Sequence, residues 1–202
     1  MYALLIWKKC IQLLFLVQKF KSGKVLNVKS SHKYLGVFIH DGLKDDTDIN
    51  RELRGIYARG NVLIKIFILC TESVKMKLFK SYCNSFYSSQ LWCNFNQSSI
   101  KKLHVAYNNV FHKLMRLETG VSISAEFVKS SVDGFRAVIR KLIHNFRCRV
   151  LNSNNILVQC ISNSVYFLSS KLNSHWTKEL FKLKWPGKFC DCCGANMYYI
   201  CI

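Results

Sequence analysis

Residues 33–56 read KYLGVFIHDGLKDDTDINRELRGI, and this stretch decides the fold because it passes from a short strand to a long helix. The apolar run over 33–39 is brief and follows polar residues, which predicts a β-strand. Two earlier apolar runs, over 11–17 and 24–28, complete a predicted antiparallel β-meander. The first run could instead form a short helix, since leucine, glutamine and lysine are good helix formers.

Beyond residue 45, apolar residues recur at three- and four-residue steps, which predicts amphipathic helices. Asp48 is placed to cap a helix that runs to about residue 68. Further helices are predicted over about 73–89 and 99–117, then near 124, then from Asp133, and finally over 155–161 and 174–183. The predicted fold class is therefore α+β and predominantly helical, with residues 1–45, 46–183 and 184–202 as three successive parts.

For two of these helices, the spacing of apolar and basic residues predicts which side chains share a face. In the helix over 73–89, the predicted buried face consists of Val74, Leu78, Tyr82 and Phe86, with Asn84 turned away. In the helix that Asp133 is expected to cap, four basic side chains follow one edge. They are Arg136, Arg140, His144 and Arg147.

The charge of the chain is strongly positive. The chain contains thirty lysines and arginines and eleven aspartates and glutamates, which gives a formal net charge of +19. Five of the eleven acids fall within residues 41–52, and none occurs between Glu72 and Glu118 or between Asp133 and Glu179. Such a field attracts polyphosphates and releases counterions when it binds them. The alternative is a basic remnant without a present function.

The spacing of the cysteines and the short apolar run near the N-terminus bear on the cellular location of the chain. Six of the ten cysteines are scattered over residues 10–160, which favours free, buried thiols in a reducing intracellular compartment, nuclear or cytoplasmic. The apolar run over 4–17 is short and contains Lys8 and Lys9, so no membrane span is expected, although an interfacial anchor stays open. The tail contains Cys190, Cys192, Cys193 and Cys201, whose crowded spacing is unlike the C-x₂-C pairs of zinc sites, and no metal is predicted there.

The order of several short motifs resembles a non-LTR retrotransposon reverse transcriptase of the LINE or jockey-like type. The resemblance covers roughly residues 20–181 and begins with the stretch quoted above. Its downstream motifs lie at 57–61, 74–75, 78–79, 82–83, 91–92, 105–109, 137–142 and 175–176. In that family these motifs belong to the edge of the palm and to the thumb. The resemblance therefore implies a palm-edge remnant followed by a thumb-like helical bundle.

The catalytic elements of that family are missing from this sequence. An intact reverse transcriptase of this type holds Mg²⁺ with carboxylates from an early palm strand and from an aromatic-x-Asp-Asp hairpin. Asp45 and Asp46 form the only adjacent aspartate pair, but they lack the aromatic residue and precede a helix. We interpret the pair as a solvated acidic loop that favours the N-terminus of the next helix. The resemblance thus implies a truncated fragment that is not an enzyme, with no catalytic residue and no cofactor.

The resemblance also implies that this part of the chain contacts a template–primer duplex. In the family, the Lys-Tyr-Leu-Gly strand lies close to the primer end and the thumb helices pack against the product duplex. Lys33 can contact a phosphate and Gly36 allows close backbone approach, while Tyr34 and Leu35 have ordinary strand packing as the alternative. The predicted nucleic-acid-binding residues from this motif are Lys33, Tyr34 and Gly36. Seven more are predicted as phosphate contacts because they are basic and lie off the apolar stripes: Arg54, Lys65, Lys101, Lys102, Arg136, Arg140 and Arg147. The expected partners are RNA, DNA or an RNA–DNA hybrid, bound by phosphate contacts without base readout.

Two other interpretations stay open at the level of sequence. The chain could be a transposon relic whose role ended with the loss of the palm. It could also be an interaction module, because helices that once packed on the palm and fingers would expose apolar surface for partners or for self-association. Leu35, Phe38 and the apolar helical stripes are the expected places for that surface.

Overall fold

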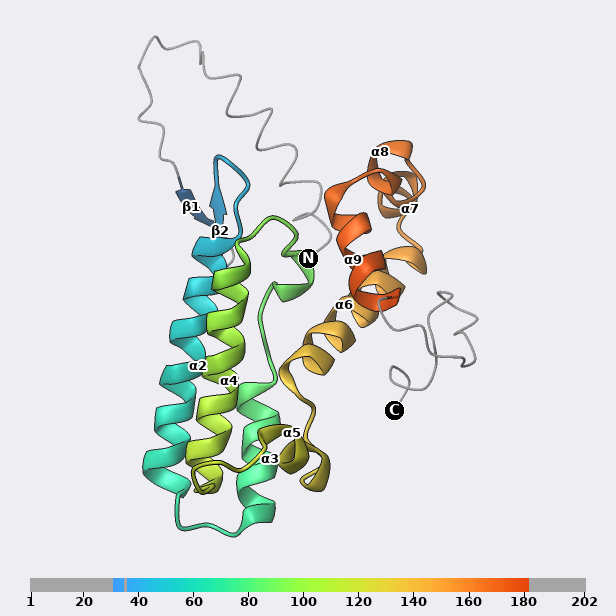
Figure 1. Cartoon of the computed structure of the whole chain (residues 1–202). Helices are drawn as coiled ribbons and strands as arrows, with labels where there is room; N and C mark the ends of the chain where they lie inside the picture. The colour runs from blue at the N-terminus through green and yellow to red at the C-terminus, as the bar shows by residue number, and fades with distance from the viewer. Residues whose placement is uncertain (1–30, 35, 182–202) are drawn as a thin grey trace.

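The computed structural model describes residues 31–34 and 36–181, and 68% of these residues are helical. A two-stranded antiparallel sheet lies at one end of a helical bundle, which confirms the α+β, mostly helical fold class (Figure 1). The predicted strands over 11–17 and 24–28 and the cysteine-containing tail over 184–202 fall outside the described residues. Within the described part, no helix combines the length and the apolar composition that a membrane crossing requires.

The stretch that opens the described chain is a hairpin. Strand β1 (Ser31–Tyr34) pairs with β2 (Val37–His40), with Lys33 opposite Phe38. The prediction of one continuous strand over 33–39 is therefore wrong. The physical reason is Gly36, whose φ of 82° lies in the left-handed region that favours glycine and turns the chain back.

Helices α2 (Asp46–Phe67) and α4 (Gln97–Met115) run side by side and form the centre of the bundle (Figure 1). The apolar stripes predicted for both helices face the first hydrophobic core, which confirms the 3.6-residue pattern. Fully or largely buried members are Ile49, Ile56, Gly60 and Leu63 from α2, and Leu103, Tyr107, Val110, Phe111 and Leu114 from α4. Arg54, Asn61 and Lys65 lie off this stripe and are exposed.

The two helices approach most closely at Gly60. A Cβ atom built there would lie 2.5 Å from Val110 Cγ1 and 2.6 Å from Val110 Cγ2. Replacing Gly60 with alanine is therefore expected to lower the free energy of unfolding by about 1–3 kcal/mol, because the packed helices must move apart. Urea unfolding followed by circular dichroism measures this change. Adding Val110→Ala should restore part of the loss, since it removes the two methyl groups in conflict.

Gly55 in the same helix is the matched control for this prediction. A Cβ atom there would lie 3.1 Å from the Arg59 guanidinium, the far end of a flexible side chain, and 3.8 Å from Glu52 Oε2, which is an ordinary contact. Gly55→Ala is expected to raise stability by about 0.5–1 kcal/mol through helix propensity. Equal losses from both glycine variants would show that contact with Val110 does not govern the helix crossing.

Helix α3 (Glu72–Cys83) buries a different face from the predicted one and ends earlier. Phe79 and Cys83 are buried, whereas Val74 and Tyr82 are exposed, so the predicted face is wrong by one position for these two. The Phe79 ring selects this face by packing edge-on against Tyr107 at 5.0 Å and Phe111 at 5.1 Å. Phe86, which lies beyond the end of the helix, is buried as predicted, and Leu78 is half-buried against the core. Asn84, predicted to turn away, ends the helix and accepts a hydrogen bond from the Tyr107 hydroxyl at 2.9 Å.

A second hydrophobic core holds the C-terminal helices around Trp176. It is built by η1 (Ser89–Leu91), α6 (Phe135–Leu151), α7 (Ile156–Ser162), α8 (Val165–Leu168) and α9 (Lys171–Phe181). Short helix α5 (Ile123–Lys129) closes the first core with Phe127. Helix η1 contacts α6, and its Leu91 belongs to the second core, whereas Phe86 and Trp92 on either side of it belong to the first core. The segment 86–92 therefore joins the two cores.

Asp133 does not cap α6 as predicted, since Gly134 occupies that position. Its carboxylate instead accepts two hydrogen bonds from Lys141 Nζ, at 2.9 and 2.8 Å, and its carbonyl accepts one from the Tyr107 hydroxyl at 2.6 Å. The same hydroxyl also bonds Asn84, and burial raises the pKa of Tyr107 above its ordinary value. Asp133 therefore positions the start of α6 against α4.

The acidic loop before α2 is part of the packing, which corrects its interpretation as a solvated loop. Asp45 is buried, and its carboxylate accepts hydrogen bonds from the backbone N–H groups of Cys93 and Asn94, both at 2.9 Å. Asp46 accepts from the Asn96 backbone at 2.9 Å and from the Ser99 hydroxyl at 2.6 Å. The aspartate pair thus ties the start of α2 to the start of α4.

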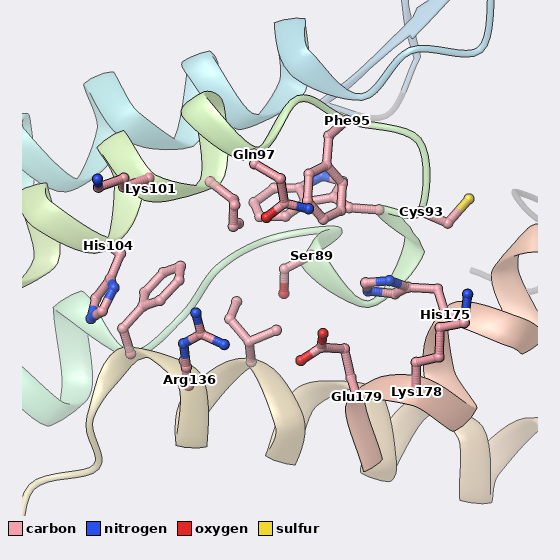
Figure 2. A pocket seen from close by; sticks show the side chains of 14 residues that line it. Ser89, Cys93, Phe95, Gln97, Lys101, His104, Arg136, His175, Lys178 and Glu179 are labelled. Atoms are coloured by element: carbon pink, nitrogen blue, oxygen red, sulfur yellow. The ribbon is translucent and has the colours of Figure 1, made fainter. Parts of the chain in front are cut away.

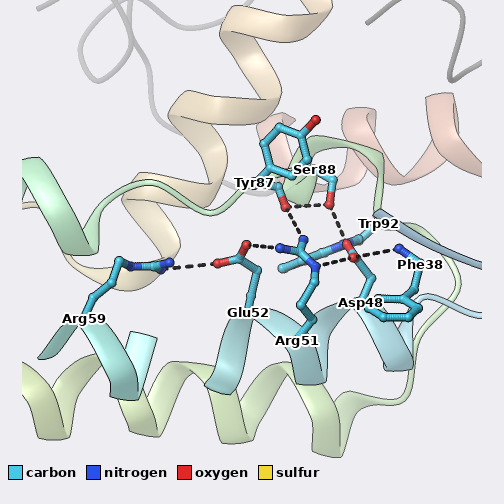
Figure 3. A network of polar contacts seen from close by, with 8 residues as sticks. All are labelled: Phe38, Asp48, Arg51, Glu52, Arg59, Tyr87, Ser88 and Trp92. Atoms are coloured by element: carbon cyan, nitrogen blue, oxygen red, sulfur yellow. Dashed lines mark hydrogen bonds and ion pairs between the residues drawn. The ribbon is translucent and has the colours of Figure 1, made fainter. Parts of the chain in front are cut away.

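Asp48 also has another role than the predicted helix cap. It lies inside the first turn of α2 with 1% of its surface exposed. Figure 3 shows its carboxylate accepting hydrogen bonds from Arg51, Ser88, the Trp92 indole and the Phe38 backbone. Although burial opposes the charged form, the carboxylates of Asp48 and Glu52 raise the pKa of Arg51. The network joins β2, α2 and the segment that leads to η1.

Candidate nucleic-acid interface

A pocket of about 550 Å³ opens where the two cores meet, between α4, α6, α9 and the segment around η1 (Figure 2). Its walls combine apolar and aromatic side chains with charged groups that come from distant parts of the chain. The lining residues are Ser89, Trp92, Cys93, Phe95, Gln97, Ile100, Lys101, His104, Phe135, Arg136, Ile139, His175, Lys178 and Glu179. Its volume lies within the roughly 300–1,000 Å³ range of small-molecule sites.

Three cations and one carboxylate line this pocket. Lys101 comes from α4, Arg136 from α6 and Lys178 from α9, and Glu179 supplies the carboxylate. Figure 2 shows Lys101, His104 and Arg136 at one end, and His175, Lys178 and Glu179 at the other. The end formed by Lys101 and Arg136 therefore offers two positive charges to an anion.

His104 stands between the two cations of that end. Its ring is stacked on Phe135, with centroids 5.0 Å apart and an interplanar angle of 17°. Burial, and then the charge of Arg136, lower the pKa of His104 below its ordinary value. A bound anion would oppose that shift, so His104 can gain a proton together with an anionic ligand.

Of the ten predicted binding residues, two line the pocket, Lys101 and Arg136. Lys33 on β1, Arg54 and Lys65 on α2, and Lys102 on α4 are exposed and lie outside its lining. Arg140 is half-buried on α6, and its Nε has no hydrogen-bond partner among the described residues. Arg147 lies with its guanidinium 5.9 Å from the Phe181 ring.

The hairpin motif and the predicted stripe on α6 have structural roles of their own. Tyr34 packs against the second core, and Gly36 forms the hairpin turn. The continuous basic stripe over Arg136, Arg140, His144 and Arg147 is wrong, because His144 is buried. Desolvation lowers the pKa of His144, and its ring lies 3.5 Å from Cys148 Sγ through Nε2. An uncharged His144 therefore interrupts the line of charge.

Sequence reasoning missed six polar residues of the pocket, namely Ser89, Gln97, His104, His175, Lys178 and Glu179. A local signal existed for two pairs. His104 follows Lys101 by three residues in α4, and Lys178 follows His175 by three in α9, so each pair shares a helix face. That these faces meet across η1 depends on tertiary packing, which the spacing does not encode.

The described residues hold neither a candidate metal centre nor a disulfide. No group of three or more histidine, cysteine, aspartate or glutamate side chains within residues 31–34 and 36–181 could hold a metal ion. Of the described cysteines, Cys83 is buried and Cys160 is exposed, so the expectation of buried thiols holds only in part. Burial raises the pKa of Cys83 to about 11. The tail cysteines at 190–201, for which no metal is predicted, lie outside the described residues.

The apolar stripes that were expected to be exposed are largely buried in the two cores. Phe38 is half-buried, and Leu35 lies outside the described residues. Exposed large apolar side chains occur singly on several helices, for example Val62 and Ile66 on α2 and Val128 on α5. Five more lie on α7 and α8, at Ile156, Leu157, Val165, Tyr166 and Leu168. The predicted location of the apolar surface, on the helical stripes, is therefore wrong. Self-association itself stays a prediction.

Comparison of the chain with protein-family models, with curated proteins and with solved structures finds no match.

Proposed function

We propose that this chain is a catalytically inactive fragment of a non-LTR retrotransposon reverse transcriptase that retains phosphate-mediated binding of nucleic acid. The ordered motifs over residues 20–181 support the family origin, and a thumb-like role for the helical bundle follows from it. The proposal assigns no reaction to the chain. Consistent with this, Asp45 and Asp46 use their carboxylates on backbone and hydroxyl donors of residues 93–99.

The observation that carries the binding proposal is the meeting of Lys101 and Arg136 at one end of the pocket (Figure 2). They lie on different helices, and both are exposed residues that line the same concave pocket. Concave walls focus the field of their charges, so this end attracts a phosphate more strongly than scattered surface cations do. The net charge of +19 supplies the long-range attraction that brings a polyanion to it.

The test is binding of the purified chain to a labelled RNA–DNA hybrid, measured by fluorescence anisotropy across a salt series. The double variant Lys101→Ala, Arg136→Ala is expected to weaken binding by on the order of 10- to 100-fold at low salt, because two charge-assisted contacts are lost. Each phosphate contact contributes about 0.9 to the slope of log affinity against log salt concentration. The slope should therefore fall by about 2.

The matched control is the double variant Arg54→Ala, Lys65→Ala. It removes the same charge from exposed positions on α2, outside the pocket lining. It should change the affinity much less than the pocket variant does. Equal losses from both pairs would show that binding is spread over the surface, and feeble binding by the folded parent chain would favour the transposon relic.

A further inference from the structure

The hydroxyl of Ser89 is the feature of the pocket that phosphate binding leaves unexplained. Ser89 is 2% exposed, and its Oγ has no hydrogen-bond partner among the described residues. The neighbouring Ser88 hydroxyl, by contrast, donates to Asp48. Figure 2 shows the Ser89 side chain pointing into the pocket, between the two charged ends. Buried polar groups in folded proteins are almost always paired, so a hydroxyl aimed into a pocket indicates a ligand with a polar edge.

The end opposite Lys101 and Arg136 has the chemistry of a base-stacking site. Phe95 and His175 contact each other edge-to-face there, with centroids 5.7 Å apart and an interplanar angle of 86°. Both side chains are only half-buried, so they can offer surface to a further ring. Lys178 and Glu179 on the same side carry opposite charges, so this end has no net positive charge for a phosphate, and the Glu179 carboxylate can accept hydrogen bonds from the amino group of a base.

The pocket thus has two cations, Lys101 and Arg136, at one end, and the rings of Phe95 and His175 with a Lys178–Glu179 charge pair of opposite sign at the other. The buried Ser89 hydroxyl lies between them (Figure 2). A nucleotide offers matching chemistry, with a phosphate at one end and, at the other, a base that has a polar edge and flat faces. A base stacked and paired within a duplex is not available to a concave site, whereas an unpaired base can be splayed into one.

We propose that the pocket binds one unpaired nucleotide of a single-stranded RNA or DNA segment. Its phosphate lies at Lys101 and Arg136, and its base packs against Phe95 and His175. The polar edge of that base reaches Ser89. The inference rests on the proposed function, because it uses the same cations, and it adds a preference for single strands over duplexes.

The experiment compares three labelled ligands at one salt concentration: a single strand of about ten nucleotides, the corresponding duplex, and an abasic strand with the same phosphates. The single strand is expected to bind more tightly than the abasic strand by on the order of tenfold, which corresponds to one stacked base. Ser89→Ala and Phe95→Leu should remove most of that difference. Both variants should leave binding to the abasic strand unchanged, since the phosphate contacts remain.

Ser85→Ala is the matched control, because Ser85 is exposed and outside the pocket lining. Thermal unfolding adds an independent readout. Ser89→Ala should keep or raise the melting temperature, because it deletes a buried hydroxyl without a partner. A lower melting temperature would show that the hydroxyl has a structural role and would overturn the inference.

The outcomes separate this inference from the proposed function. If all three ligands bind equally and the variant Lys101→Ala, Arg136→Ala weakens them all, phosphate binding stands and the nucleotide pocket is refuted. If none of the three ligands binds to the folded chain, both proposals fail. A gap between intact and abasic strands that survives Ser89→Ala and Phe95→Leu places base recognition elsewhere on the chain and also refutes the pocket.

Discussion

Replacing Asp48 with alanine is expected to lower the free energy of unfolding by about 3–5 kcal/mol, because it leaves buried donors and the Arg51 guanidinium without their acceptor. The carboxylate accepts from Arg51 Nε at 2.8 Å, from the Trp92 indole at 2.9 Å and from the Phe38 backbone at 3.2 Å (Figure 3). These donors belong to three separate segments of the chain. Urea unfolding followed by tryptophan fluorescence measures the loss.

Asp41→Ala is the control for this prediction. The Asp41 side chain is exposed, and its bonds are local, to His40 and to the Gly42 backbone. Its removal should change stability by no more than about 0.5 kcal/mol. The account of the network would be wrong if Asp48→Ala and Asp41→Ala unfolded at the same urea concentration. Asp48→Asn should fall between them, since the amide keeps one acceptor and loses the charge.

The second large effect is expected at Trp176, whose replacement by alanine should destabilise the chain by about 3–5 kcal/mol. Trp176 has 0% of its surface exposed and packs edge-on against Phe146 at 5.7 Å and Phe167 at 5.9 Å. Its indole N–H donates to the Gln90 carbonyl at 2.8 Å and thereby ties α9 to η1. Thermal and urea unfolding both report this loss.

Tyr166→Ala is the control, because Tyr166 is an aromatic residue of the same half that is 79% exposed. It should alter stability by about 0.5 kcal/mol or less. Trp176→Phe is informative as well, since it keeps a ring in the core but deletes the hydrogen bond to Gln90. If Trp176→Ala and Tyr166→Ala were equally mild, the second core would not depend on its central indole.

The consequences of Trp176 extend to the pocket. The same helix carries His175, Lys178 and Glu179, which line it, and Gln90 immediately follows Ser89. Anchoring the indole on η1 therefore fixes one end of the pocket relative to its centre. A variant that loosens this contact should lose the preference for single strands before it loses phosphate binding, because Lys101 and Arg136 lie on α4 and α6.

Elements whose face is encoded by a single clear period were predictable from the sequence. The stripes of α2 and α4 are the examples, and both face the core as expected. The face of α3 was not predictable, because apolar residues occur on two of its sides. Phe79 decides between them by its contacts with Tyr107 and Phe111, which lie 28 and 32 positions further along the chain.

Composition and periodicity by themselves determined the mostly helical fold class and the strongly basic character, and they placed Lys101 and Arg136 among the basic residues that lie off the apolar stripes. These properties are local or additive, so they can be read one segment at a time. Tertiary structure decided the fate of the acidic residues 45–48 and the existence of the pocket. Asp45, Asp46 and Asp48 find partners 40 to 53 positions away, and four separate segments line the pocket. Such partners come together only when packing of the two cores fixes the distances between helices.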